Sequence, residues 1–145
     1  MSNDSGLSQA TPDEILAFIH SIEGGGLTER MGITITEADF DHLVGTMPVK
    51  GNTQPYGFLH GGASAVLAET LGSIGAAVHA GPNRFPVGIE LSCSHHLSAT
   101  KGIVTGVARP VRIGSTLSTW EIVITDDADR RLCTARLTCL VRDRI

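Results

Sequence analysis

The longest helix that the sequence predicts is GGASAVLAETLGSIGAAVH, residues 61–79. Small and aliphatic residues cover nearly all of its sides, which is typical of a helix buried on most of its surface rather than one lying on an exterior. Pro82 and Asn83 mark the turn that follows. We therefore expect one nearly uncharged helix at the centre of the fold.

Strand-like runs follow this helix. Four of them lie at residues 87–97, 102–113, 117–125 and 132–141, separated by short turn signals. Connections this short favour antiparallel neighbours. Residues 32–36, and more weakly 41–48, predict further strands upstream of the helix. The expected fold class is therefore α+β, with one antiparallel sheet of five or six strands packed around one long helix.

A second helix is predicted near the N-terminus. Thr11 and Glu14 form a capping-box pattern, and Pro12 takes the first helical position, so this helix should run to about Ile22. Three glycines, at positions 24–26, should end it. We expect residues 1–23 to form a tail and helix, and residues 24–145 to form the single main domain that this length allows.

The charges are unevenly distributed along the 145 residues, whose net charge is −4. Residues 1–69 hold two bases and nine acids, a sum of −7, whereas residues 70–145 hold nine bases and six acids, a sum of +3. The net acidity argues against a general nucleic-acid binder, and an aromatic share of 4% offers little for base stacking. The basic half could bind a small polyphosphate, or it could keep strand edges soluble.

The cysteines and the N-terminus favour a cytoplasmic location. Cys93, Cys133 and Cys139 show no metal-ligand spacing, and an odd number makes a poor disulfide framework. Residues 1–10 are polar and carry Asp4, unlike a signal peptide. The apolar run at 58–78 contains Glu69 and several glycines, which makes it a poor membrane span, so we expect no membrane partner.

Glu69 is the main anomaly of the predicted central helix. It is the only charged side chain between Lys50 and Arg84. A buried carboxylate is costly unless it is hydrogen-bonded, paired or protonated. Ser73 follows at i+4, so a carboxylate and a hydroxyl can point into one small volume. Glu69 is either a catalytic group or a structural carboxylate satisfied by a subunit partner or a backbone amide.

Two glycines, Gly61 and Gly62, open the predicted helix, where unpaired N–H groups and the positive end of the helix dipole accumulate. Such a site can hold a developing oxyanion, and the absence of side chains lets a ligand approach the backbone. His60 could hydrogen-bond a substrate or fix the loop. The alternatives are a tight loop-to-helix junction and an ordinary cap. Together with Glu69 two turns later, this helix start matches the needs of hydrolysis of an activated acyl compound.

Other chemical motifs are weaker or absent. The sequence contains no Gly-x-Ser-x-Gly elbow, Walker A loop, His-Glu-x-x-His or Cys/His zinc pattern. His95 and His96 are neighbours on a predicted strand and should point to opposite faces, so we expect no metal site there. Arg109, Arg112 and the turn at residues 114–116 are candidates for phosphate contacts, or they form a plain hairpin turn.

The block NTQPYGFLHGGAS, residues 52–64, followed by LAETLGS, residues 67–73, resembles the signature of hotdog-fold acyl-CoA thioesterases. The most similar branch contains glutamate-type 4-hydroxybenzoyl-CoA thioesterase, the enterobactin-pathway proofreading thioesterase and 1,4-dihydroxy-2-naphthoyl-CoA thioesterase. The resemblance covers roughly residues 24–141 and continues through residues 87–90, His95, 114–115, Trp120 and 131–133.

The resemblance implies a curved antiparallel sheet around a central helix, and it assigns roles by position. Glu69 would be the nucleophile or general base, and the Gly61 amide would polarise the thioester carbonyl. Gln54 and His60 would position thioester and water, and Ser73 would orient the hydrolytic step. Substrate or coenzyme A contacts would fall on Gly62, Arg84, His95, Arg109, Gly114 and Ser115. Relatives often carry a base where this chain has Leu97, so Arg84, Lys101 or Arg109 could substitute for that contact.

The resemblance also implies active sites formed between two subunits, usually in a homotetramer built as a dimer of dimers. It implies no cofactor beyond the coenzyme A of the substrate, no metal and no nucleic-acid partner. We expect an aryl acyl-CoA thioesterase, with 1,4-dihydroxy-2-naphthoyl-CoA of menaquinone biosynthesis as the leading substrate.

Three alternatives remain open at the level of the sequence. One is a proofreading thioesterase that acts on aryl groups held by an acyl-carrier protein. Another is a non-catalytic acyl-CoA-binding hotdog domain, which would leave Glu69 without a purpose. The third is a hotdog dehydratase, for which no matching His/Asp motif occurs outside the Glu69 block.

Overall fold

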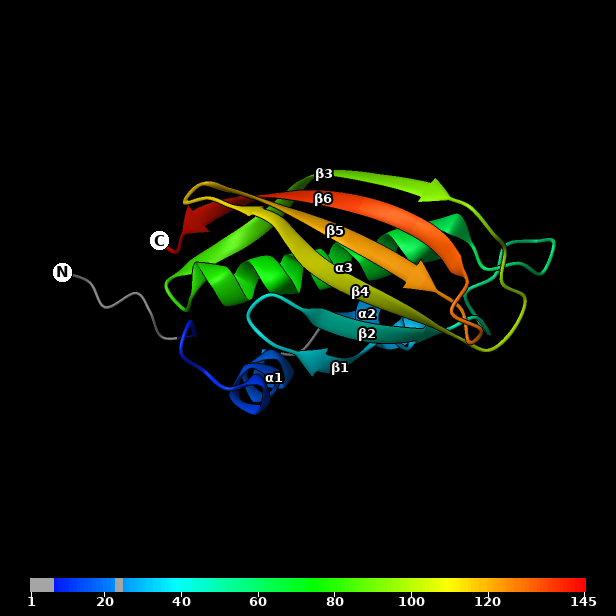
Figure 1. Cartoon of the computed structure of the whole chain (residues 1–145), viewed down its shortest axis with the longest axis horizontal. Helices are drawn as coiled ribbons and strands as arrows, with labels where there is room; N and C mark the ends of the chain where they lie inside the picture. The colour runs from blue at the N-terminus through cyan, green and yellow to red at the C-terminus, as the bar shows by residue number, and fades with distance from the viewer. Residues whose placement is uncertain (1–6, 23–24) are drawn as a thin grey trace.

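An antiparallel sheet curves around helix α3 (Gly61–Ala80), which runs along the inner face of the sheet (Figure 1). The computed structural model describes residues 7–22 and 25–145. The strands are β1 (Thr34–Ala38), β2 (Leu43–Pro48), β3 (Arg84–His95), β4 (Ile103–Ile113), β5 (Leu117–Thr125) and β6 (Arg131–Asp143). Their order is β1-β2-β4-β5-β6-β3, and every neighbouring pair is antiparallel. The predicted α+β class is confirmed.

Helix α3 lies close to the sheet because glycines face bulky side chains where the two surfaces meet. A Cβ on Gly75 would lie 2.6 Å from the ring of the fully buried Trp120. On the strands, Gly45 and Gly106 make room in the same way for Leu71 of the helix. Ten residues of α3 are buried, and the flank that carries Glu69 is half-buried. The expectation of a helix buried on most sides is confirmed, with one flank left partly open.

Helix α3 is also, among the described residues, the one helix long and apolar enough to cross a membrane by length and composition. Half of its apolar window is buried inside the fold. A core helix under a sheet meets the same criterion, so this property follows from its place in the core.

The N-terminal helix α1 (Pro12–Ser21) has the predicted capping box. The Thr11 hydroxyl accepts from Glu14 N, and the Glu14 carboxylate accepts from Thr11 N at 2.8 Å. Ile15 and Ile19 are buried in the same core as α3 and the sheet. Helix α1 ends at Ser21, one residue before the expected end. The expected boundary between residues 23 and 24 lies outside the described residues, and so does the first residue of the expected stop at 24–26.

A short helix that the sequence analysis did not predict, α2 (Gly26–Met31), lies between α1 and β1. Its N-cap is Gly25, which provides no side-chain hydrogen bond, and its C-cap is Gly32, which has a left-handed φ of 69°. The sequence analysis expected the glycines at positions 25 and 26 to end the first helix, but they also begin the next one. That start was missed because a glycine N-cap has no side chain that could signal a helix start.

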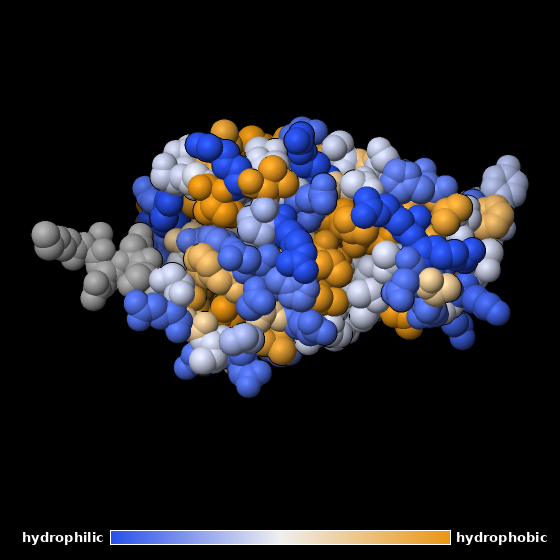
Figure 2. Space-filling view, in the orientation of Figure 1, coloured by the Kyte–Doolittle hydropathy of each residue, from blue (hydrophilic) through white to orange (hydrophobic). Residues whose placement is uncertain are grey.

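Strand β3 forms one edge of the sheet and is twelve residues long. It starts three residues earlier than predicted, because Arg84 pairs with Asp143 in the register with β6. Its side chains Phe85, Val87 and Ile89 are exposed. A long apolar edge strand is an unpaired surface that proteins normally cover or blunt. On the face seen in Figure 2, apolar side chains likewise reach the surface in patches between polar ones.

Candidate active site

The start of α3 presents an open backbone N–H. The His60 side chain caps the helix, with Nδ1 accepting from Gly62 N at 2.8 Å, so this ring carries its proton on Nε2 when neutral. Among residues 7–22 and 25–145, the Gly61 N–H has no acceptor. The ring of His95 lies beside it, with Nε2 3.0 Å from where a Cβ on Gly61 would stand. The predicted group of His60, Gly61, Gly62 and His95 is thus brought together.

The loop before α3 carries Gln54. Asn52 anchors the loop, because its Nδ2 donates to the backbone oxygens of Met31 and Pro48, both at 2.8 Å. The backbone oxygen of Asn52 in turn accepts from His60 N at 2.9 Å. Gln54 Oε1 accepts from Tyr56 N inside the loop, which leaves the amide NH₂ of Gln54 as its free donor among the described residues.

The Glu69 carboxylate lies against strand β3 at Gly88. A Cβ on Gly88 would collide with Glu69 Oε1, and Gly88 stands at the point where the β3–β6 register shifts. Within the part of the chain that the structure describes, Glu69 has no ion pair and no hydrogen-bond donor. The alternative of a carboxylate satisfied by a backbone amide of its own chain is therefore not what the structure shows.

Ser73 and two cysteines face the same volume as Glu69. Burial raises the pKa of the Cys139 thiol to about 11, a hydrogen bond with Ser73 lowers it, and the charge of Glu69 raises it. The pKa of Cys93 is also raised, first by burial and in smaller part by Glu69, while a hydrogen bond with Cys133 opposes the rise. Thiols with raised pKa values stay protonated and are poor nucleophiles. The cysteines of this cluster are therefore poor candidates for the reactive group, and Glu69 stays the candidate.

The helix start and Glu69 lie at separate points along α3. They are eight residues apart on α3, which is about 12 Å at roughly 1.5 Å per residue. A reacting carbonyl has to lie about 3 Å from both the oxyanion donor and the attacking group. The two halves predicted to work together are thus two separate half-sites in each chain.

Of the residues predicted to contact coenzyme A, Gly62 and His95 lie at the helix start, and the others lie in two further places. Arg84 lies just beyond the C-terminal end of α3, where Nη2 donates to Ser115 O at 2.6 Å and Nε pairs with Asp143 at 3.0 Å. Gly114 N donates to Leu117 O at 2.8 Å and closes the hairpin between β4 and β5. Arg109 is exposed and lies opposite Glu121 on the outer face of the sheet, away from α3.

The two neighbouring histidines have the opposite orientations expected of them. His95 faces Gly61, whereas His96 Nε2 lies 3.0 Å from Thr134 Oγ1 on the other side of the strand. Within residues 7–22 and 25–145, no group of three or more His, Cys, Asp or Glu side chains could hold a metal ion.

A family model described as the thioesterase superfamily matches residues 56–133, which include both half-sites. The chain belongs to the thioesterase superfamily. Its matched span runs from the loop before α3 to the first residues of β6, so the family resemblance covers the elements that carry Gly61, Glu69 and Gly88.

Curated relatives and solved structures agree with this thioesterase assignment. The chain is 45% identical over 127 residues to the proofreading thioesterase EntH of Cronobacter turicensis, which covers 87% of this chain and 93% of the relative. It is 41% identical over 123 residues to EntH of Klebsiella pneumoniae, covering 84% of this chain and 90% of the relative.

A crystal structure of a variant thioesterase of Pseudomonas aeruginosa superposes with a TM-score of 0.84 and 34% identity, over 94% of this chain and 98% of the other. A thioesterase structure from Haemophilus influenzae gives a TM-score of 0.83 and 29% identity, over 93% of this chain and 92% of the other. The protein is a thioester hydrolase with the hotdog fold.

Two residues of this thioesterase site were missing from the residues predicted for it. Gly88 gives Glu69 its space, and Asn52 holds the loop of Gln54. A glycine inside a strand is a known sign of a bulge or a close approach, so Gly88 carried a usable signal. The anchoring role of Asn52 had no such signal, because one of its partners is the backbone oxygen of Met31, which is distant in the sequence.

Proposed function

We propose that this thioesterase hydrolyses aryl thioesters at a site completed by two copies of the chain. One copy supplies the Gly61 N–H, and the second copy supplies Glu69. The observation that carries the proposal is the pair of half-sites. Among the described residues, one N–H has no acceptor and one carboxylate has no partner, and the two lie about 12 Å apart along one helix. Two antiparallel copies of α3 would bring the N–H of one beside the carboxylate of the other.

The edge strand β3 supports a second copy beside this site. Gly88, which contacts Glu69, lies on β3, and the exposed Phe85, Val87 and Ile89 lie on the same strand. Pairing of this edge with a second β3 would cover the apolar side chains and bring the two α3 helices together. Assembly of two such dimers into a tetramer is our proposal for the full particle.

The chemistry follows from the charges of the two half-sites. The Gly61 N–H, at the positive end of the helix dipole, stabilises the negative charge that develops on the carbonyl oxygen. In one route Glu69 takes a proton from water, the water oxygen bonds to the carbonyl carbon, the carbon–sulfur bond breaks and the proton passes to the thiolate. In the other route a Glu69 oxygen attacks, the thiolate leaves, and water then hydrolyses the mixed anhydride.

Residues of the loop before α3 and of α3 itself would position the reactants. Gln54 keeps its amide NH₂ for the thioester or water, and His60 keeps an Nε2–H. Ser73 lies one turn after Glu69 and would orient the hydrolytic step. For coenzyme A, we keep Gly62, Arg84, His95, Arg109, Gly114 and Ser115 as candidate contacts.

A carrier-protein substrate is better supported than naphthoyl-CoA. The EntH relatives, 45% and 41% identical, are named proofreading thioesterases, and none of the comparisons described above concerns menaquinone synthesis. We therefore favour the alternative in which the protein clears aryl groups attached to a carrier protein. Hydrolysis of 1,4-dihydroxy-2-naphthoyl-CoA is the second candidate.

The substrate is tested by presenting one aryl group on coenzyme A and on a carrier protein. We expect a higher kcat/KM for the carrier-protein form. Glu69→Gln should lower kcat by about 10³-fold or more on both forms with the fold retained, while Glu37→Gln, an exposed glutamate on β1, should leave kcat unchanged. Equal turnover by wild type and Glu69→Gln would contradict the catalytic assignment, and faster hydrolysis of the naphthoyl-CoA would favour the second candidate.

The two routes for Glu69 are separated by a single turnover in water labelled with heavy oxygen. If Glu69 attacks the carbonyl, one label enters its carboxylate when the anhydride is hydrolysed there. If Glu69 acts as a base, the label enters the product acid alone. Mass spectrometry of the peptide containing Glu69 distinguishes the two results.

A further inference from the structure

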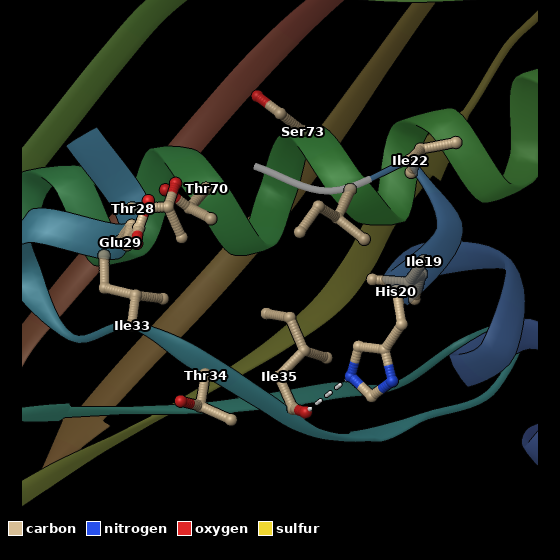
Figure 3. A pocket seen from close by; sticks show the side chains of 11 residues that line it. Ile19, His20, Ile22, Thr28, Glu29, Ile33, Thr34, Ile35, Thr70 and Ser73 are labelled. Carbon is tan, nitrogen blue, oxygen red and sulfur yellow. Dashed lines mark hydrogen bonds between the residues drawn. The ribbon is translucent and has the colours of Figure 1, made fainter. Parts of the chain in front are cut away.

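A cavity of about 570 Å³ lies between α3 and the elements α1, α2 and β1 (Figure 3). Five of its eleven lining residues are isoleucines, and none of these described residues is a lysine or an arginine. An anionic group would meet no cation there. A surface that binds an acidic partner therefore has to lie elsewhere on the molecule.

Three arginines without an ion pair lie at one end of the sheet. Arg112 lies near the end of β4, and Arg142 lies near the end of β6. Arg144 follows β6, where its backbone N–H donates to Asn83 O at 3.0 Å. All three side chains are exposed, and within residues 7–22 and 25–145 none of them forms an ion pair. This end of the sheet therefore carries positive charge that no carboxylate of the described chain neutralises.

The register of the sheet places two of these arginines on the same face as an exposed leucine. Arg142 lies on the face of Leu117, because the β6 partner of Leu117 is two residues before Arg142. Arg112 lies on this face too, because its β5 partner Thr119 is two residues after Leu117. Leu117 is 45% exposed. We call Arg112, Leu117, Arg142 and Arg144 the basic end.

Two acidic side chains at this end of the molecule face other groups. Asp143 pairs with Arg84 at 3.0 Å. Asp41, in the connection between β1 and β2, lies 3.7 Å from His79 in the last turn of α3. Neither of them pairs with an arginine of the basic end. Exposed and unpaired charges of one sign steer a partner of the opposite sign toward a surface.

The basic end lies where α3 ends. Figure 1 shows the end of α3, the start of β3, the β4–β5 turn and the end of β6 at the same end of the molecule. One small hollow there is lined by residues from these segments, among them Ala80, Arg84, Gly114 and Val141. Ala80 is eleven residues after Glu69, which is about 16 Å at roughly 1.5 Å per residue. In the proposed dimer Glu69 lies beside the Gly61 N–H of the second copy, so the basic end lies just beyond the start of that copy's α3.

We infer that the basic end docks the carrier protein that presents the thioester. The inference rests on the proposed function and adds the surface that its carrier-protein substrate would contact. Carrier proteins are small acidic domains that hold an acyl group as a thioester on a flexible phosphopantetheine arm. Such a partner complements the arginines in charge, and Leu117 offers it an apolar contact. From this position the arm extends past the end of α3 to the Glu69 of one copy and the Gly61 N–H of the other.

The kinetic test presents one benzoyl group in three forms: on an acidic carrier protein, on coenzyme A and on pantetheine, which is uncharged. Arg142→Glu combined with Arg144→Glu should raise KM for the benzoyl carrier protein about tenfold or more with kcat little changed, because the reversed charges repel the acidic domain. KM for benzoyl-CoA should change far less, and KM for benzoyl-pantetheine should stay as in wild type. Arg30→Glu reverses an exposed charge on α2 and is the control that should leave all three values unchanged.

The salt dependence of the reaction gives a second readout of the same surface. Raising the salt concentration should raise KM for the benzoyl carrier protein in wild type, and much less in the double variant. If KM for benzoyl-CoA rose as much as KM for the carrier protein, the arginines would bind coenzyme A phosphates, and the inference would be overturned. It would also be overturned by unchanged KM values for all three forms. A change in oligomeric state by size-exclusion chromatography would overturn it as well, since copies of the chain would then meet at the basic end.

Binding keeps the inference separate from the proposed reaction. A carrier protein that holds the benzoyl group through an amide in place of the thioester gives a stable ligand. In calorimetry the double variant should bind this ligand about tenfold more weakly than wild type does. That loss would support the basic end even if neither protein hydrolysed the thioester. Equal affinities would overturn the docking surface while the carrier-protein substrate stands, and no binding to wild type would overturn both while hydrolysis of benzoyl-CoA stands.

Discussion

The Gly61 N–H is the smallest feature on which the proposed reaction depends, and a proline can remove it selectively. Gly61 is the first residue of α3, where proline is well tolerated, and His60 has φ −68° and ψ 129°, as a residue before proline requires. Gly61→Pro should lower kcat about 10²–10³-fold, as the loss of an oxyanion donor does, with the fold retained by circular dichroism.

The matched control for this proline is Gly61→Ala. Alanine brings a Cβ to the same position beside His95 but keeps the N–H. Because His95 is exposed, its ring has room to shift. Gly61→Ala should therefore lose far less kcat than Gly61→Pro. Equal losses in the two variants would assign the effect to crowding of His95 and not to the N–H.

Gly88 sets the position of the Glu69 carboxylate from the neighbouring strand. A Cβ on Gly88 would collide with Glu69 Oε1. Because this oxygen is the end of a flexible side chain, we expect the carboxylate to shift while the backbone keeps its fold. Gly88→Ala should lower kcat roughly 10–100-fold, since a displacement of about 1 Å can cost that much, with little change in Tm. Gly26→Ala, where a Cβ meets nothing within 4 Å, should change neither quantity. A large fall in Tm for Gly88→Ala would mean a structural role instead.

At the scale of the elements, His79 joins the last turn of α3 to the connection between β1 and β2. Its side chain is 9% exposed, Nε2 lies 2.5 Å from Phe40 O, and its ring packs against those of Phe40 and Trp120. Burial lowers the pKa of His79, while the Phe40 carbonyl and Asp41 oppose this shift less strongly. The folded protein therefore takes up a proton at His79 less readily than the unfolded chain.

This depressed pKa predicts a loss of stability in acid. As pH falls below about 6.5, the unfolded chain binds the proton first, so the free energy of unfolding decreases until the folded-state pKa is reached. Urea unfolding at about pH 7.5 and about pH 5 should show a smaller decrease for His79→Gln than for wild type. His96→Gln, exposed on the outer face, should keep the wild-type decrease. Equal decreases in wild type and His79→Gln would contradict the prediction.

The elements with local signals were predictable from the sequence. The capping box at Thr11 gave the start of α1, the composition of residues 61–79 gave α3, and β5 matches its predicted bounds. Helix α2 was missed because Gly25 gives no capping signal. The early start of β3 depends on pairing with β6, a long-range contact that no local pattern encodes.

The sequence predicted which residues are candidates for the active site, but it did not predict how they are placed relative to one another. Glu69 stood out as a lone charge, and Gly61 as a helix start, but no local pattern says whether the two residues of one working site come from the same copy of the chain, as the proposed function requires that they do not. Gly88 contacts Glu69 through the packing of β3 on α3, which depends on tertiary structure. The sequence therefore predicts the groups, and the fold decides which of them can meet.

At the scale of the whole molecule, the basic second half of the chain does not act as one patch. Arg84 pairs with Asp143, and Arg130 pairs with Asp126 at 2.6 Å. Arg109 and Arg136 lie on either side of Glu121 in the register of the sheet. Four bases of this half thus have an acidic neighbour, which favours solvated strand faces over a single phosphate-binding surface at these positions.

The two-copy site makes a quantitative prediction for mixed particles. In a dimer of one Glu69→Gln chain and one Gly61→Pro chain, one site combines an intact Gly61 N–H with an intact Glu69, and the other site lacks both. Random mixing makes about half of the dimers mixed, each with one working site of two, so about a quarter of the wild-type rate per chain should return.

A site contained within one chain would behave differently in this mixture, because each chain would still carry one defect and no activity would return. The two variants should be unfolded and refolded together, or coexpressed, so that the chains exchange. Separately refolded variants combined afterwards, without exchange, are the control and should stay inactive. Return of activity only after exchange would place Gly61 and Glu69 of each working site on different copies, as the proposed function holds for two groups about 12 Å apart along α3.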